Sequence, residues 1–415
     1  MSTTDAIAHP NQPDLDPFLA WLRHGRESSP VHPDENQPTW QLFGHADIHR
    51  VLSDPATFSS DMSKFIPPQS DFELFSRGNF VRMDPPMHRK LRDLVSQAFT
   101  PRVVSGLAPR IAAITGELLD GVGGAERFDL VGALAYPLPV IVIAELLGIP
   151  VADRESFRRW ADSLLSREGT GALPDEATMN RMGSTLREMN EYLLAHIRQR
   201  RARPTDDLIG KLVRAELDGH RLEDEEIVGF VGLLLIAGHI TTTALVGNAI
   251  LCLDENPAAA AELRADPAGI PAAIEEVLRY RPPFPRLARR TTTEVEIGGK
   301  RIPADRILIL WLASANRDSA QFEDPDRFNI HRKPNPHLSF GYSIHFCLGA
   351  PLARLEAKIA LEILLDRYRS IAVARDDRRE FFNPFTMISA KRLPVTVEAA
   401  RAGGKGEAPR GVVSA

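Results

Sequence analysis

One cysteine stands where a thiolate could do chemistry. Cys347 lies near the end of the loop FGYSIHFCLG (residues 340–349), and a helical pattern begins directly after it. Backbone N–H groups at a helix N-terminus stabilise a thiolate, and glycines let a flat group approach the backbone closely. The chain has one further cysteine, which gives no disulfide framework. Cys347 alone could be a small buried core residue, but we favour a thiolate that binds a metal.

A second candidate lies inside the most apolar stretch of the chain, residues 227–253. The run AGHIT places Gly238 and Thr241 in what should be a long helix. A glycine inside a helix costs about 1 kcal/mol relative to alanine, so we expect a neighbouring group to use the space. The Thr241 hydroxyl could act on a bound ligand, or it could bond back to its own helix.

Two further pairs are spaced to share one helix face. Glu276 and Arg279 are three residues apart, which alone is typical of a common ion pair worth roughly a few tenths of a kcal/mol. His88 and Arg92 are four residues apart at an expected helix start near Pro86. This second pair is compatible with a solvated basic face and with an anion-binding face.

Together these motifs carry a family resemblance. The loop at Cys347 resembles the haem-binding loop of the cytochrome P-450 family, Phe-Gly-x-Gly-x-His/Arg-x-Cys-x-Gly. The resemblance covers about residues 15–400, with the motifs in the expected order. It implies one triangular domain, mainly α with small β sheets. It also implies that Cys347 is the axial ligand of a haem b iron, in a loop that includes Phe340, Gly341 and Gly349.

The resemblance assigns roles to the other motifs as well. It implies an oxygen-binding groove at Ala237, Gly238 and Thr241, with Thr241 as a proton relay. Four cations would bind the two haem carboxylates: His88, Arg92, Arg289 and His345. A structural brace beneath the haem would consist of Glu276, Arg279 and, from the run DPDRF, Arg327.

The chain departs from the family pattern at two positions. Ile240 stands where an acid is usual, and His239 lies about 160° around the helix from Thr241, so it is a poor replacement. Proton delivery must then use water, a substrate hydroxyl or another loop. Ser343 stands where glycine is usual, and a positive φ there would strain it by about 1 kcal/mol or more.

Helical patterns dominate the elements that must position these residues. Residues 55–85 have little periodicity and are expected to form a long loop, which is often functional. Residues 1–14 are expected to be flexible, and residues 401–415 are expected to be disordered. We expect helices at 17–25, 47–52, 104–122, 136–148, 350–368 and two within 151–203, and a long central helix that opens with residues 223–226 and closes near 254–256. Strands are expected at 40–43, 291–297, 307–310 and within 370–398.

Composition favours a soluble protein of the cytoplasm. The 415 residues are 43% hydrophobic and 25% charged with a net charge of −5, which gives no reason to expect nucleic acid. The basic run 198–204 is interpreted as cations at a helix C-terminus. The polar N-terminus has no signal-peptide pattern, and two cysteines fit a reducing compartment. The stretch 227–253 could span a bilayer, but its polar residues favour a buried core helix and no membrane.

The resemblance implies a haem-thiolate monooxygenase of the soluble bacterial class, expected to be a monomer. Electrons would come from NAD(P)H through a ferredoxin reductase and a ferredoxin. The expected substrate is a bulky secondary metabolite, a macrolide or other polyketide, tailored during antibiotic biosynthesis. Segments expected to contact it are 55–85, 165–180, 282–287 and 383–388, which contain Phe284, Leu287, Met387 and Ile388. Two alternatives remain: a peroxide-driven enzyme of the same fold, suggested by Ile240, and a non-catalytic haem or ligand-binding recruitment module.

Overall fold

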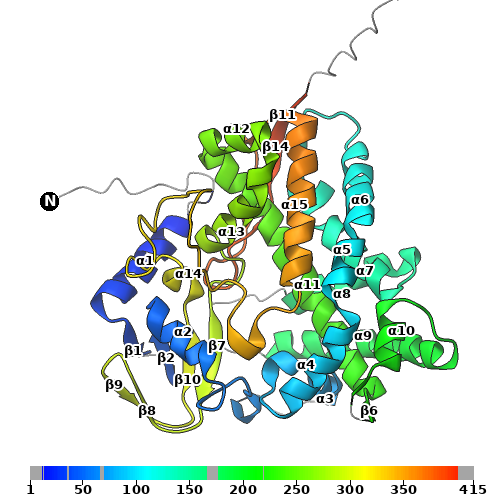
Figure 1. Cartoon of the computed structure of the whole chain (residues 1–415), viewed down its shortest axis with the longest axis vertical. Helices are drawn as coiled ribbons and strands as arrows, with labels where there is room; N and C mark the ends of the chain where they lie inside the picture. Colours follow the sequence, from blue (N-terminus) through cyan, green and yellow to red (C-terminus); the bar gives the residue numbers. More distant parts are fainter. Residues whose placement is uncertain are drawn as a thin grey trace, which may run out of the picture.

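The computed structural model describes residue 12 and residues 14–400, except 35–36, 66–69, 166–175 and 218. Almost all of the expected flexible N-terminus and the whole expected C-terminal tail therefore lie outside the described residues. Within the described part, helices form most of the molecule; the largest sheet lies at one side, and smaller sheets are spread over other parts (Figure 1). The sequence-based expectation of a mainly α protein with small β sheets is confirmed.

The helices follow the apolar periodicity of the sequence closely. Four short helices were not expected: those at Ser70–Arg77, Leu208–Arg214, Pro257–Ala265 and Leu312–Ala315. The expected helix at 104–122 is divided in two, with Pro109 near the start of the second part. The α-helices are α1 (Leu15–Ser28), α2 (His45–Ser53), α3 (Ser70–Arg77), α4 (Met87–Ala98), α5 (Pro101–Gly106), α6 (Ala108–Asp120), α7 (Pro137–Leu147), α8 (Arg154–Leu165), α9 (Glu176–Ala202), α10 (Leu208–Arg214), α11 (Asp224–Glu255), α12 (Pro257–Ala265), α13 (Ile270–Tyr280), α14 (Leu312–Ala315) and α15 (Ala350–Arg367). Short turns of other helix types lie at Ser63–Phe65 (η1), Phe80–Arg82 (η2), Val131–Ala135 (η3), Val151–Asp153 (η4), Pro267–Gly269 (η5) and Ser343–His345 (η6).

Helix α11 is the central element. It has 32 residues, about 48 Å at 1.5 Å per residue, and begins with a capping box between Glu223 and Glu226. It packs against α3, α7, α9 and α15, and Figure 1 shows it passing through the helical part. By length and composition it could cross a membrane, but 72% of its most apolar window is buried inside the protein. This burial is that of a core helix, as expected.

The largest sheet lies beside the helical part and has the strand order β1-β2-β10-β7-β3 (Figure 1). Strands β2 and β10 pair in parallel, and all other neighbouring strands of this sheet pair antiparallel. Its strands are β1 (Val31–Pro33), β2 (Thr39–Leu42), β3 (Phe58–Ser59), β7 (Leu287–Thr291) and β10 (Ile307–Leu310). The smaller sheets use β4 (Arg127–Asp129), β5 (Glu216–Leu217), β6 (His220–Arg221), β8 (Val295–Ile297), β9 (Lys300–Ile302), β11 (Tyr368–Val373), β12 (Glu380–Phe381), β13 (Ala390–Arg392) and β14 (Pro394–Ala399).

Two expectations about local structure change. Residues 55–85 are not one long loop, because they include β3 and the helix α3, which packs on α11 and α9. The segment 291–297 is not one strand: β7 ends at Thr291, and β8 then pairs with β9.

The basic end of α9 is a helix terminus whose arginines are paired with acids. Arg200 forms an ion pair with Asp207, and Arg201 forms one with Asp224.

Candidate functional site

The loop that ends at Cys347 is held by its own backbone. The Cys347 N–H donates to the carbonyl oxygen of Phe340 at 2.9 Å, which closes the loop just before α15 begins at Ala350. Gly341 has φ +70°, a conformation that side chains rarely adopt. The glycine at this position is therefore required by the turn.

The Cys347 thiol lies between two opposing influences. Burial raises its pKa, whereas the backbone N–H groups of Gly349 and Ala350 and the charges of Arg92 and Arg354 lower it. These N–H groups belong to the start of α15, where peptide dipoles favour negative charge. The residue is partly accessible, and its sulfur is supplied with groups that stabilise a thiolate.

Ser343 has φ +58°, so the expected strain at this position is confirmed. We predict that Ser343→Gly raises the free energy of unfolding by roughly 0.5–1 kcal/mol, because the relief of left-handed strain exceeds the added freedom of the unfolded chain. Chemical denaturation of both proteins measures the change. Ser343→Asn should give a smaller gain, since asparagine tolerates this conformation. A loss of stability in Ser343→Gly would show that the serine side chain contributes more than its backbone costs.

An ionic clamp holds the other side of the loop. The Arg354 guanidinium lies over the Phe340 ring, 4.5 Å from its centroid, and donates to both carboxylate oxygens of Glu275 at 2.7 and 2.8 Å. His337 contacts the same carboxylate at 3.1 Å. These partners lower the pKa of Glu275 to about 2 against the effect of burial. The loop is thus fixed to α13 as well as to α15.

The four predicted cations come together from three segments of the chain: α4, β7 and the loop before Cys347. The rings of His88 and His345 lie 4.2 Å apart between centroids. Arg92, one turn beyond His88 on α4, donates to the carbonyl of Phe346 at 2.6 Å. Arg289 reaches the group from β7, which the sheet fixes by pairing it with β10. We call His88, Arg92, Arg289 and His345 the cation cluster.

The cation cluster has buried donors without protein acceptors. Both ring nitrogens of His88 and the Nδ1 of His345 are buried with no hydrogen-bond partner among the described residues. Burial and the neighbouring cations lower the pKa of His345 to about 3, and burial lowers that of Arg289 to about 10. Asp84 is the carboxylate that acts on His88 and Arg289. Unpartnered buried ring nitrogens beside the charges of Arg92 and Arg289 favour the binding of further anions.

Helix α11 presents an accessible stripe in a middle that, apart from Ile236, is otherwise buried. Ala237 is exposed and Leu233, Leu234, Gly238 and Thr241 are partly accessible, at the spacing of one helix face. An accessible face on a core helix indicates open space beside it. The structure thus places all three predicted groove residues, Ala237, Gly238 and Thr241, on the same stripe.

Within this stripe, the Thr241 hydroxyl donates to the carbonyl of Ala237 at 2.8 Å. The hydroxyl therefore bonds back to its own helix, and its oxygen can still accept hydrogen bonds from a ligand or water. His239 is buried and contacts Tyr136, away from the stripe as its spacing predicted. Ile240 is 6% exposed, so an acid at this position would lie in the core. A Cβ on Gly238 would lie 2.6 Å from Ile143 Cδ1, so a core side chain uses this space.

The brace contains a different arginine from the expected one. Glu276 and Arg279 are fully buried and form two hydrogen bonds of 2.8 Å. The second guanidinium on Glu276 belongs to Arg332, 3.2 Å away, and the exposed Arg327 contributes only its carbonyl oxygen to Arg279. The prediction of Arg327 was wrong, because the irregular chain after α14 turns back and brings a residue five positions later to the carboxylate.

The expected substrate segments differ in accessibility. Met387 and Ile388 are buried in the core, whereas Phe284 and Leu287 are half-buried. Most of the segment 165–180 lies outside the described residues. Of these four residues, Phe284 and Leu287 keep the accessibility that a contact with substrate requires.

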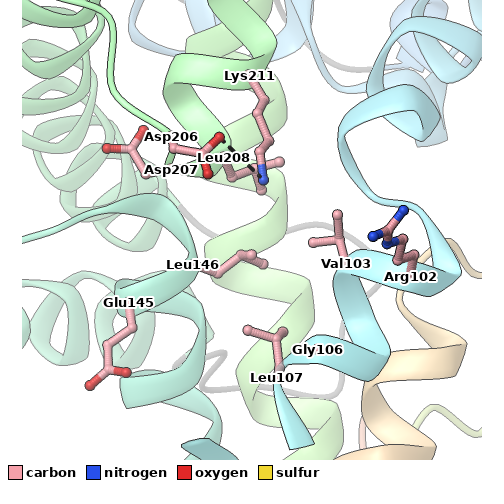
Figure 2. A pocket seen from close by; sticks show the side chains of 10 residues that line it. All are labelled: Arg102, Val103, Gly106, Leu107, Glu145, Leu146, Asp206, Asp207, Leu208 and Lys211. Atoms are coloured by element: carbon pink, nitrogen blue, oxygen red, sulfur yellow. Dashed lines mark ion pairs between the residues drawn. The ribbon is translucent and has the colours of Figure 1, made fainter.

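A surface hollow of about 460 Å³ lies elsewhere, between α5, α7 and α10 (Figure 2). Its acids already have partners: Glu145 binds Arg110 and Asp207 binds Arg200. The Lys211 amine lies 3.8 Å from Asp206. No residue of the Cys347 loop, the cation cluster or the accessible stripe lines this hollow, so it is separate from the candidate site.

Comparison with known proteins decides the family. Residues 270–398 match the family model described as cytochrome P-450. The chain is 50% identical over 353 residues to the cyclomarin C epoxidase CymV of Salinispora arenicola, covering 85% of this chain and 89% of that protein. It is 47% identical over 400 residues to the erythromycin C-12 hydroxylase of Saccharopolyspora erythraea, covering 95% and 98%. The chain belongs to the cytochrome P-450 family.

A solved structure agrees with this membership. The cytochrome P-450 described here matches a mutant of P-450 EryK in complex with erythromycin B with a TM-score of 0.85 at 45% identity, covering 96% of this chain and 99% of that chain. The relatives are a hydroxylase and an epoxidase, so this cytochrome P-450 is a monooxygenase with a haem-iron cofactor. The site fits that cofactor: the sulfur of the partly accessible Cys347 suits the iron, and the unpartnered ring nitrogens of His88 and His345 beside Arg92 and Arg289 suit two carboxylates.

Sequence reasoning missed several supporting residues of this cytochrome P-450. Ser60 contacts the Nε2 of His345 at 2.9 Å, and buried Asn316 accepts from the N–H of Leu338 and donates to Ser339. The clamp of Glu275 and Arg354 was also missed. A possible signal was an acid next to Glu276 together with an arginine in the helix after Cys347, but nothing in the sequence indicates Ser60.

Proposed function

We propose that this cytochrome P-450 inserts one oxygen atom of O₂ into a bulky macrolide or other polyketide, by hydroxylation or epoxidation. The observation that carries this proposal is the 47% identity to an erythromycin C-12 hydroxylase over 98% of that protein. A hydroxylase and an epoxidase both stand among the relatives, so both reactions remain within the proposal. The accessible stripe supports an apolar substrate, because Leu233, Leu234 and Ala237 dominate it.

We assign the haem to the space between α11 and the loop before α15. Cys347 would be its axial ligand, with Phe340, Gly341 and Gly349 in the surrounding loop. The cation cluster would bind its two carboxylates, with His88 and His345 donating from ring nitrogens that have no protein acceptor among the described residues. Arg92 and Arg289 would supply permanent charge to this contact.

Haem iron with a thiolate ligand activates O₂ and supplies the oxygen-transfer chemistry. The chain's own part is to place substrate, exclude bulk water and move protons. Ala237, Gly238 and Thr241 would border the reacting space on α11. With Ile240 in the core, protons would reach Thr241 through water or a substrate hydroxyl, accepted by the free lone pairs of its hydroxyl oxygen.

Thr241→Ala should lower product formed per NADPH about tenfold or more, at the low end of what positioned proton transfer contributes. Hydrogen peroxide release should rise correspondingly, because electrons then leave without oxygenating substrate. Parallel assays of product, NADPH and peroxide measure this coupling. Thr241→Ser keeps the hydroxyl and should therefore retain most of the product formed per NADPH. Unchanged coupling in Thr241→Ala would remove Thr241 from the proton route.

The electrons would come from NAD(P)H through a ferredoxin reductase and an acidic ferredoxin. The surface of α4 supports this choice, since the Arg89 side chain is 83% exposed and lies 3.7 Å from the carboxylate of Asp93. Met87 and Phe346 are 46% and 39% exposed beside it. An exposed arginine with exposed apolar side chains nearby suits a small acidic protein. The protein would act in the cytoplasm as a monomer.

A macrolide panel tests the proposal. Erythromycin-type and other macrolides are titrated against the loaded protein, followed by the low-spin to high-spin absorbance change. They are then incubated with ferredoxin, reductase and NADPH, and products are analysed by mass spectrometry. A gain of one oxygen atom supports the proposal. Products with hydrogen peroxide but none with ferredoxin would instead establish the peroxide-driven alternative. Binding without NADPH consumption would establish a binding module.

A further inference from the structure

Helices α3 and α11 meet at two glycines. Gly78 follows α3, and a Cβ built on it would lie 1.9 Å from the carbonyl oxygen of Glu226 and 2.5 Å from the nitrogen of Phe230. A Cβ on Gly229 in α11 would lie 2.4 Å from the nitrogen of Gly78. Each of these obstructing atoms belongs to the backbone and cannot rotate away. A side chain at either glycine would therefore separate the two segments.

The contact continues one turn further along α11. Gly232 lies three residues after Gly229 and shares its face. A Cβ on Gly232 would lie 2.9 Å from Met189 Cε of α9 and 3.1 Å from the Phe75 ring of α3. We call Gly229 and Gly232 the glycine notch. Each glycine costs a helix interior about 1 kcal/mol relative to alanine, so close packing must offset that cost.

The chain that follows Gly78 leads to α4, which contains His88 and Arg92, two of the four residues of the cation cluster. Directly after Gly78, the Phe80 ring stacks on Phe230 of α11, with 6.0 Å between centroids and 23° between planes. The same ring contacts the His88 ring at 5.8 Å, and the Arg92 guanidinium lies 5.9 Å from its centroid. Because the Phe80 ring contacts Phe230, His88 and Arg92, a shift of α3 relative to α11 would also displace His88 and Arg92.

The notch also adjoins the space beside α11. The accessible stripe begins at Leu233, the residue that follows Gly232. Leu74 and Phe75 of α3 are partly buried against the same core. A displacement of α3 would therefore change the border of the reacting space as well as the cation cluster.

We propose that Gly78, Gly229 and Gly232 are positioning residues: their close contact sets where α3 lies and thereby fixes His88 and Arg92 and the ligand selectivity of the adjoining space. The part concerning ligand selectivity rests on the proposed function. The part concerning the cations requires only that the cluster binds the carboxylates of the haem.

The test compares two alanine substitutions in one helix. Gly229→Ala places a methyl group against backbone atoms, whereas a Cβ on Gly247 meets no atom within 4 Å. Haem transfer from each loaded protein to apomyoglobin is followed by absorbance. Gly229→Ala should lose haem about tenfold faster or more, a factor typical of distortion by overpacking. Gly247→Ala should match the wild type, and Gly232→Ala should be intermediate because flexible side chains obstruct it.

Equal haem-loss rates in Gly229→Ala and Gly247→Ala would overturn the proposal. If Gly229→Ala does not fold, Gly232→Ala and Gly247→Ala give the same comparison with a milder change, and equal rates in that pair overturn it too. Titration with erythromycin supplies the second readout, in which Gly229→Ala should weaken the spin-state change more than Gly247→Ala does. If no macrolide binds the wild type but haem loss still differs, the substrate class fails and the positioning role stands.

Discussion

Cys347→Ser is expected to lower oxygenation to the level of the haem-free protein, because a serine hydroxyl is not deprotonated at neutral pH and cannot replace the thiolate. Product formation with ferredoxin, reductase and NADPH measures the loss. The loop itself should remain formed, since its closing hydrogen bond uses the backbone of residue 347 and the carbonyl of Phe340. The variant should therefore fold with near wild-type circular dichroism.

The second cysteine is the matched control for this experiment. Cys252 lies in α11 with no exposed surface, and burial raises its pKa to about 12. It is an inert core thiol, so Cys252→Ala should lower stability modestly and leave oxygenation per haem unchanged. If Cys347→Ser kept substantial oxygenation, or if Cys252→Ala lost it, the assignment of the ligand would be wrong.

Glu276→Gln is expected to lower the free energy of unfolding by about 3–5 kcal/mol, the usual effect of breaking a buried ion pair from one side. The substitution leaves the guanidinium groups of Arg279 and Arg332 in the core without a carboxylate. Their side chains are 0% and 8% exposed, so water cannot replace the lost charge. Urea unfolding of the loaded protein measures the difference.

A surface ion pair gives the control for that measurement. Glu117 binds Arg110 at 2.8 Å, but its side chain is 64% exposed. Glu117→Gln should therefore change stability by about 0–1 kcal/mol. If Glu276→Gln were as mild as Glu117→Gln, the brace would contribute little to stability.

The parts of the site that short-range chemistry dictates were predictable from the sequence. The loop at Cys347 was recognisable because a left-handed turn needs Gly341 and a helix must follow the ligand. The strain at Ser343 was predictable for the same reason, and its φ of +58° confirms it. The long apolar run of α11 likewise specified a core helix and placed Thr241 on one face and His239 on another.

Features that depend on long-range chain paths were not predictable. Arg332 rather than Arg327 reaches Glu276, because the irregular segment folds back without any periodic pattern to reveal its course. Helix α3 was missed within 55–85, since its contact with α11 depends on backbone approach at Gly78 and Gly229, which no pairwise spacing indicates. The assembly of the cation cluster from three segments followed only from the family resemblance.

The central claim is that Cys347 provides the thiolate ligand of a haem iron. The most direct test is the absorbance spectrum of the reduced protein with bound carbon monoxide, recorded for the wild type, Cys252→Ala and Cys347→Ser. The account predicts the long-wavelength Soret band of a thiolate ligand in the wild type and in Cys252→Ala, and its loss in Cys347→Ser. A wild-type spectrum without that band, or its persistence in Cys347→Ser, would contradict the account.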